Sequence, residues 1–263
     1  MGDAGSNCIG GRVPWDLLPL LPLGILAGLL SGLLGIGGGL IFSPLLLWIG
    51  LSPHQALATS TLAILPTTMG GSWAHLRSGQ VPMPAMGAIG AGAISGSLVF
   101  SHLGTVLSGW QLLALQGLMY AVLALVIRPP QDGDTHPARL PLLGLATVGV
   151  VAGWASGLLG VGGGLVMVPL MVRWLRLRVY LAIRLSTLAV CASAATASIT
   201  FVSDGRANLG MGLLLGGSAC IAAQWAAARL QRVSEARLVW LLRALCVLLA
   251  ADGLRRAAQL ALG

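Results

Sequence analysis

Long apolar stretches alternate with short polar breaks along the whole chain. Between the breaks lie segments of about 20 residues, which is the length that a helix needs to cross the hydrocarbon core of a bilayer. The pattern therefore predicts an all-α polytopic membrane protein with eight to ten membrane segments. The polar breaks fall near residues 51–54, 77–82, 101–108, 173–180, 203–208 and 229–237.

One longer polar stretch, RPPQDGDTHPAR at residues 128–139, interrupts the pattern near the middle of the chain. Its prolines, glycine and charges cannot enter hydrocarbon cheaply, so we expect a surface linker there. The sequences on its two sides resemble each other. Residues 24–50 (GILAGLLSGLLGIGGGLIFSPLLLWIG) match residues 149–175 (GVVAGWASGLLGVGGGLVMVPLMVRWL) at 14 of 27 positions.

The similarity continues beyond these segments once a single residue is inserted, pairing Ser60 with Ser186 and Gly79 with Gly205. The chain is therefore expected to be a duplicated unit of four or five helices. The predicted organisation is an N-terminal tail (1–14), a first transmembrane repeat (15–127), the linker (128–139) and a second transmembrane repeat (140–263).

The two Gly-rich segments are too long to be single helices. Trp15 to Gly50 is 36 residues, which as one helix would measure about 54 Å against a hydrocarbon core of about 30 Å. The cluster at residues 35–39 is where the backbone is expected to turn or unwind, and residues 160–164 are its counterpart. Each segment is predicted to be two short helices joined at GxGGG, as a hairpin or as a re-entrant element.

The arginines distinguish two topologies. If each Gly-rich segment crosses the membrane once, the flanking arginines divide seven to six between the two sides. If each crosses twice, they divide nine to four, which agrees with the positive-inside rule. An odd number of crossings in each half would make the two copies inverted, with periplasmic termini and a cytoplasmic linker.

Composition narrows the class further. The chain is 56% hydrophobic and only 8% charged, and its mean hydropathy is +0.90, which excludes a water-soluble fold. The net charge of +8 comes from fifteen arginines and no lysine. Because these cluster between apolar segments, the lipid bilayer and not nucleic acid is the expected partner. The first residues lack the basic region of a signal peptide, so we expect the first helix to stay in the mature protein of a bacterial plasma membrane.

The Gly clusters are the strongest candidate site. Unwound backbone at membrane depth is tolerated only where protein or a water-filled cavity satisfies it, and a helix that begins there would present N–H groups to an anion. The alternative is close helix packing, which we favour for Gly28, Gly32, Gly153 and Gly157. Three consecutive glycines would cost about 1 kcal/mol each in a helix interior, so the triplets favour unwinding.

Hydroxyl groups and a charge lie in the spans that follow. Thr59, Ser60 and Thr61 pair with Leu185, Ser186 and Thr187, and these hydroxyls either bond their own helix or hold a ligand. Arg184 is about 9 Å deeper along its helix than Arg178, and is either buried and functional or extended to the surface.

Other titratable groups are sparse in the spans. His54, His75 and His102 are expected at the membrane–water interface. No Asp or Glu falls in the middle of a span, which disfavours a carboxylate proton relay and favours an anionic cargo. The glycine motif is not GxGxxG and no Walker A sequence is present, so no nucleotide cofactor is expected. The four cysteines lack metal-ligand spacing, and no His, Asp, Glu or Cys cluster suggests a metal site or an enzyme.

The doubled pattern GxxxGxxSGLLGxGGGxxxxPLL, each copy followed by an STLA segment, resembles the TauE/SafE family of sulfite and organosulfonate exporters. The resemblance covers the chain from Leu23 to the last helix and implies transport of sulfite, sulfoacetate or related anions. The second copy departs from the first where Leu185 replaces Thr59 and Arg184 replaces Ala58.

The hypothesis is a secondary carrier for a small anion, not an enzyme, that works by alternating access and needs no cofactor or metal. Its candidate partners are the anionic substrate, the bilayer and a second copy of the chain in a homodimer. The rival is a membrane scaffold or assembly subunit in which the glycines serve packing alone. The candidate substrate-binding residues are Ser31, Gly35, Gly37, Gly38, Gly39, Thr59, Ser60, Thr61, Ser156, Gly160, Gly162, Gly163, Gly164, Arg184, Ser186 and Thr187.

Overall fold

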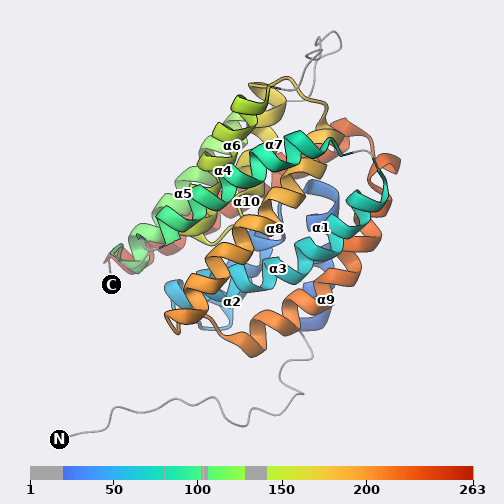
Figure 1. Cartoon of the computed structure of the whole chain (residues 1–263). Helices are drawn as coiled ribbons and strands as arrows, with labels where there is room; N and C mark the ends of the chain where they lie inside the picture. The colour runs from blue at the N-terminus through green and yellow to red at the C-terminus, as the bar shows by residue number, and fades with distance from the viewer. Residues whose placement is uncertain (1–19, 80, 102, 104–105, 128–140, 263) are drawn as a thin grey trace, which may run out of the picture.

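A computed structural model describes residues 20–79, 81–101, 103, 106–127 and 141–262. The predicted tail (1–14) and linker (128–139) lie outside these ranges, as do Cys8, Arg12, Arg128 and Arg139. The described chain is helical, without a strand (Figure 1). Its elements are α1 (Leu20–Leu34), α2 (Gly39–Trp48), α3 (Pro53–Arg77), α4 (Met83–Ser101), α5 (Gly109–Val126), α6 (Leu142–Leu159), α7 (Gly164–Arg173), α8 (Val179–Ser203), α9 (Leu209–Ala228), the 3₁₀ turn η3 (Leu230–Arg232) and α10 (Glu235–Leu262).

The helices end where the polar breaks predicted, and local capping explains several of these boundaries. The Ser52 hydroxyl accepts a hydrogen bond from the N–H of Gln55 at the start of α3. The side chain of Asn208 likewise accepts from the N–H of Met211 at 3.1 Å, which starts α9. Each cap satisfies a backbone donor that a helix N-terminus leaves open.

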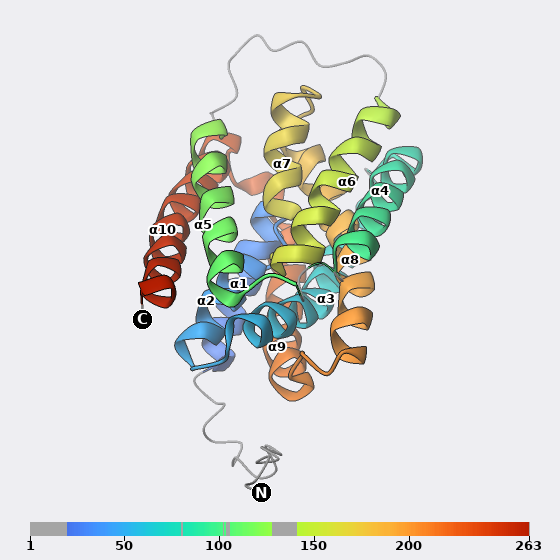
Figure 2. The same cartoon turned by 90° about the vertical axis from the view of Figure 1, so that its left-hand side faces the viewer.

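Both Gly-rich segments break at the glycine cluster, which confirms that prediction. Residues 35–38 separate α1 from α2, and residues 160–163 separate α6 from α7. Three glycines in each break have positive φ, a conformation that side chains other than glycine rarely adopt. In Figure 2, α6 descends from the upper end of the bundle and α7 returns toward it, so this segment turns back as a hairpin. The positive-φ glycines are Gly35, Gly37, Gly38, Gly160, Gly162 and Gly163.

Helices of one half pack against helices of the other. The α6 helix lies along α4, and its counterpart α1 lies along α9. Glycines allow these close approaches, because a Cβ on Gly153 would collide with the carbonyl oxygen of Ala93 and one on Gly28 with that of Ala219. The packing role predicted for these glycines is confirmed. The longest related pair, α3 and α8, also pack on each other.

Five of the described helices, α4, α5, α6, α8 and α9, are long and apolar enough to cross a membrane, and α1, α2 and α7 are shorter apolar helices. Large apolar side chains also face outward on many of them, as lipid-facing surfaces require. Examples are Leu125, Leu143, Ile199 and Ile221, which are more than two-thirds exposed.

The described arginines near the helix ends separate unequally. In Figure 2, α5 runs upward and its counterpart α10 runs downward, so the two halves point in opposite directions in the bundle. By the directions of their helices, seven arginines lie at the end where α5 finishes and α6 begins, and three lie at the other end. This is the separation that two crossings per Gly-rich segment require; the orientation in a membrane stays a prediction. The seven are Arg77, Arg173, Arg176, Arg178, Arg229, Arg232 and Arg237, and the three are Arg206, Arg255 and Arg256.

Candidate functional site

The two glycine turns meet each other between α3 and α8. A Cβ built on Gly37 would lie 2.7 Å from Val190 on α8 and 2.9 Å from Ile64 on α3. A Cβ on Gly162, the equivalent glycine of the other half, would meet the same two side chains at 3.2 and 3.0 Å. Gly39 also approaches the second turn, since its Cβ would lie 2.6 Å from the carbonyl oxygen of Val161. We call the meeting of residues 35–39 and 160–164 the glycine crossing.

Two serine hydroxyls join the turns to the long helices. The Ser60 hydroxyl on α3 lies 3.4 Å from the carbonyl oxygen of Gly39 in its own half and 3.3 Å from that of Gly160 in the other. The Ser186 hydroxyl on α8 repeats this pattern, at 3.4 Å from the Gly164 oxygen and 2.7 Å from the Gly35 oxygen. Each hydroxyl has one proton and shares it between two carbonyls. Both halves are therefore tied together at their most irregular backbone.

Two helix N-termini open onto the glycine crossing. The α2 helix begins after its N-cap Gly38, and α7 begins after its N-cap Gly163; neither N-cap supplies a side-chain hydrogen bond. The first N–H groups of a helix lack partners within the helix and carry the positive end of its dipole, although here the Gly164 N–H already donates to the Gly162 carbonyl at 2.8 Å. Such an end is suited to holding an anion.

The glycine crossing is tightly packed in this conformation. A Cβ on Gly35 would lie 2.7 Å from the carbonyl oxygen of Ile183, and one on Gly160 would lie 2.5 Å from that of Leu57. Backbone therefore contacts backbone where the candidate site lies.

The remaining predicted hydroxyls have different surroundings. Thr61 and Thr187 each donate a 2.9 Å hydrogen bond to the carbonyl four residues earlier in their own helix. In this conformation, therefore, these hydroxyls bond their own helix. The Thr59 hydroxyl accepts from the backbone N–H of Asn208 at 2.9 Å and so anchors the start of α9.

The serines that precede the two turns are both buried. Ser31 is 2% exposed on α1, and Ser156 is fully buried on α6. The hydroxyl of Ser156 is 3.3 Å from that of Ser193 on α8, which links α6 to the helix beside the glycine crossing.

Arg184 is buried in the bundle, with 8% of its surface exposed, so it does not extend to the surface. It lies on α8, two residues before Ser186, and α8 packs on α3, which carries His75. His75, in the last turn of α3, has a side chain that is only 2% exposed, so it is buried within the protein, and its position at the membrane–water interface stays a prediction. Its Nε2 atom is buried without a hydrogen-bond partner among the described residues.

The signal that sequence reasoning missed for His75 is helical spacing. A Cβ on Gly71, one turn earlier on α3, would lie 3.1 Å from the methyl group of Thr187. Residues four apart share a helix face, so the face of α3 that carries His75 lies on α8.

The part of the chain that the structure describes contains no group of three His, Cys, Asp or Glu side chains arranged to hold a metal ion. Cys191, Cys220 and Cys246 are free thiols.

Comparison with known proteins gives a family. The model of the family described as "Sulfite exporter TauE/SafE" matches residues 20–252. A "Probable membrane transporter protein" of Xylella fastidiosa (strain 9a5c) is 31% identical over 182 residues, which cover 66% of this chain and 70% of that protein. The "Probable membrane transporter protein YunE" of Bacillus subtilis (strain 168) is 24% identical over 259 residues, covering 88% and 94%.

A plant relative matches a shorter region. The "Sulfite exporter TauE/SafE family protein 1" of Arabidopsis thaliana is 49% identical over 57 residues, which are 22% of this chain and 12% of that protein. No solved structure matches the chain. The family match extends from the first described helix into α10 and includes both glycine turns, and the resemblance seen in the doubled motif is confirmed. The chain belongs to the TauE/SafE family of membrane transporters.

Proposed function

We propose that the protein is a secondary transporter that moves a small sulfur-containing anion, such as sulfite, sulfoacetate or another organosulfonate, across the bacterial plasma membrane. The observation that carries this proposal is the pair of helix N-termini, Gly38–Gly39 and Gly163–Gly164, that open without side-chain caps onto the glycine crossing. The family description names sulfite export and supports the choice of anion.

The charges around the glycine crossing favour an anion over a cation. Arg184 lies two residues from Ser186, whose hydroxyl is part of the glycine crossing. The three acids of the described chain lie elsewhere: Asp204 follows α8, Glu235 begins α10, and Asp252 lies in the C-terminal part of α10. Backbone N–H groups, hydroxyls and one guanidinium offer donors that suit the oxygens of sulfite or a sulfonate.

Alternating access would come from rocking of the two halves about the glycine crossing. Ser60 and Ser186 each bond carbonyls of both halves, so separating the halves exchanges these bonds for bonds to the anion. The substrate site in this proposal consists of the turn residues Gly35, Gly37–Gly39, Gly160 and Gly162–Gly164 with Ser31, Ser156, Ser60, Ser186, Thr61, Thr187 and Arg184.

Flux measured in proteoliposomes tests the proposal. The wild-type protein is expected to carry radiolabelled sulfite or sulfoacetate, and Ser186→Ala is expected to slow this flux at least about tenfold, because a hydrogen bond to a charged group contributes about 1.5–3 kcal/mol. Gly217→Ala is the control for purification and reconstitution of a variant protein. Gly217 is exposed on α9, and an added Cβ would meet nothing within 4 Å. A wild-type protein that carries neither anion would refute the proposal.

The rival function, a scaffold or assembly subunit, makes the opposite prediction. Gly38→Ala and Gly163→Ala alter the N-caps of α2 and α7, and both positions have positive φ. A carrier would lose flux in these variants, whereas a scaffold would keep its partners as long as the variants stay folded. Size-exclusion chromatography of each variant checks the folding.

A further inference from the structure

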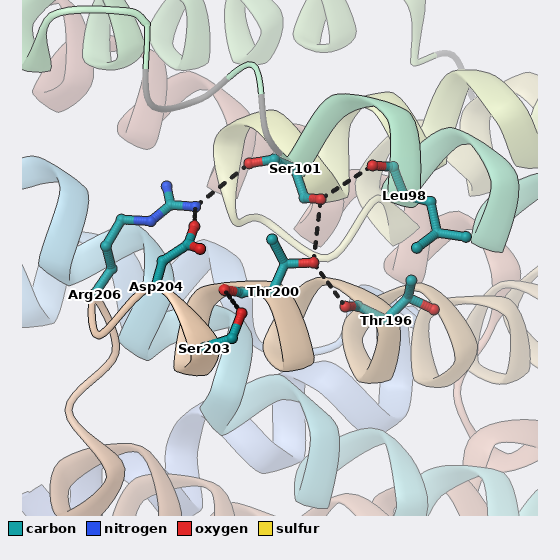
Figure 3. Close-up of polar contacts among 7 residues, drawn as sticks. All are labelled: Leu98, Ser101, Thr196, Thr200, Ser203, Asp204 and Arg206. Carbon is teal, nitrogen blue, oxygen red and sulfur yellow. Dashed lines mark hydrogen bonds and ion pairs between the residues drawn. The ribbon is translucent and has the colours of Figure 1, made fainter.

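A second cluster of polar side chains lies away from the glycine crossing, at the turn between α8 and α9. The Arg206 guanidinium lies 2.5 Å from the Asp204 carboxylate and 3.5 Å from the carbonyl oxygen of Ser101 at the end of α4 (Figure 3). It also lies over the Phe201 ring, 4.6 Å from its centroid. Ser101 in turn donates to the Thr200 hydroxyl at 3.4 Å.

The guanidinium has hydrogen-bonding capacity left. Both contacts, to Asp204 and to Ser101, use the same nitrogen, Nη2. The Nε atom of Arg206 is buried and has no hydrogen-bond partner among the described residues. A buried donor of a charged group without a partner is unfavourable unless a ligand or water meets it.

Arg206 lines a small hollow, one wall residue of which also packs on the glycine crossing. His54, Ala58 and Phe201 form other parts of its wall. Leu57 lines it too, and the Leu57 carbonyl is the atom that a Cβ on Gly160 would meet at 2.5 Å. In this conformation the hollow has space for about one water molecule.

The other half of the protein has a different cation at the equivalent place. The one-residue insertion in the repeat pairs Ala58 with Arg184 and Phe201 with His75. Arg184 precedes Ser186 on α8, toward the end of the bundle where α8 begins, and at the opposite end Arg206 lies over Phe201 beside Ala58. One guanidinium therefore lies on each side of the glycine crossing, supplied from unrelated positions of the two repeats.

We propose that Arg206 is an outer binding site for the oxyanion, on the side of the α8–α9 turn, and that Asp204 closes this site in the conformation described here. This inference rests on the proposed function. An arriving oxyanion takes the place of the Asp204 carboxylate on the guanidinium and accepts from the remaining N–H groups, for which an arginine fork is well shaped. From there the anion reaches the glycine crossing past Ala58 and Leu57.

Uptake measured from each side of oriented proteoliposomes tests the outer site. In Arg206→Gln, the KM for sulfite presented at the α8–α9 side is expected to rise about tenfold or more, while the KM from the other side stays within about twofold. Arg206→Lys keeps the charge and is expected to recover part of the loss. Asp204→Asn removes the competing carboxylate and is expected to lower the KM on the same side.

Arg255→Gln is the matched control. Arg255 pairs with Asp252 at 3.1 Å toward the same end of the bundle, but its side chain is 62% exposed and it does not line the hollow. Its KM values are expected to equal those of the wild type. Thermal unfolding of each variant shows whether it is folded, and Asp204→Asn tests the site even if Arg206→Gln does not fold.

The outcomes separate the two proposals. Wild-type protein without anion flux refutes the proposed function. Wild-type flux together with unchanged KM values in both Arg206→Gln and Asp204→Asn refutes the outer site alone. An equal rise of the KM from both sides in Arg206→Gln also refutes it, because a site on one side affects binding from that side.

Discussion

The two glycine turns are nearly identical in backbone geometry although they come from different halves of the chain. Gly35 has φ of +69° and Gly160 has φ of +62°, and each packs on the carbonyl of a long helix, Ile183 and Leu57 respectively. Ser60 and Ser186 contact the turns in the same pattern. The two copies thus share the residues that the main chain of the crossing requires.

The surroundings of the turns differ much more. Ala58 in the first half corresponds to the buried Arg184 in the second, and Thr59 corresponds to Leu185. Symmetry therefore holds for the glycine turns and for the two serines that bond them, and it breaks at the two positions that precede each serine.

The largest expected loss of folding free energy comes from a substitution in the glycine turns, where the two halves are most alike. Gly160→Ala places a methyl group 2.5 Å from the Leu57 oxygen at a positive φ. We expect a loss of about 1–2 kcal/mol of folding free energy from the left-handed backbone and about 1–3 kcal/mol more from overpacking. Gly35→Ala should cost a similar amount, because its methyl would meet the Ile183 oxygen. Thermal unfolding in detergent measures both losses.

Gly79→Ala separates the two contributions to this loss. Gly79 has φ of +65°, but an added Cβ meets nothing within 4 Å. Only the backbone term, about 1–2 kcal/mol, should remain. If Gly160→Ala and Gly79→Ala lower the unfolding temperature equally, then crowding of the added methyl group against the Leu57 oxygen of α3 costs nothing.

The repeated glycine turns were predictable because their signal is local and chemical. Three consecutive glycines cannot remain helical cheaply, and the break occurs at both clusters. Polar breaks likewise located the ends of the long helices, because charged and turn-forming residues are costly in hydrocarbon.

Contacts between distant helices were not predictable in the same way. The Ser186 hydroxyl and the Gly35 carbonyl that it bonds lie 151 residues apart in the sequence. The burial of His75 depends on which face of α3 meets α8, and the contact of Arg206 with the Ser101 carbonyl depends on where the α8–α9 turn meets the end of α4. Such choices follow from packing of the whole bundle and not from any one segment.

The two serines of the glycine crossing are expected to make smaller and unequal contributions to the folding free energy. The Ser186 hydroxyl lies 2.7 Å from the Gly35 oxygen, whereas both contacts of Ser60 are 3.3–3.4 Å. Ser186→Ala should therefore cost about 1–1.5 kcal/mol of folding free energy and Ser60→Ala about 0.5–1 kcal/mol. Thr67→Val is the control, since the Thr67 hydroxyl bonds only its own helix at Ala63. Equal unfolding temperatures for the two serine variants would show that the shorter bond is no stronger.

The smallest expected effect concerns Thr59, whose counterpart is the apolar Leu185. Thr59→Val removes the acceptor of the Asn208 N–H at the start of α9, which should lower the folding free energy by about 0.5–1 kcal/mol. Anion flux should persist, because this hydroxyl anchors a helix end and does not bond the glycine turns. Unfolding temperature and proteoliposome flux are measured on the same preparation. Loss of flux at an unchanged unfolding temperature would instead assign Thr59 to the anion, as a second residue of the substrate site, beside Arg184, that has no like counterpart in the other half.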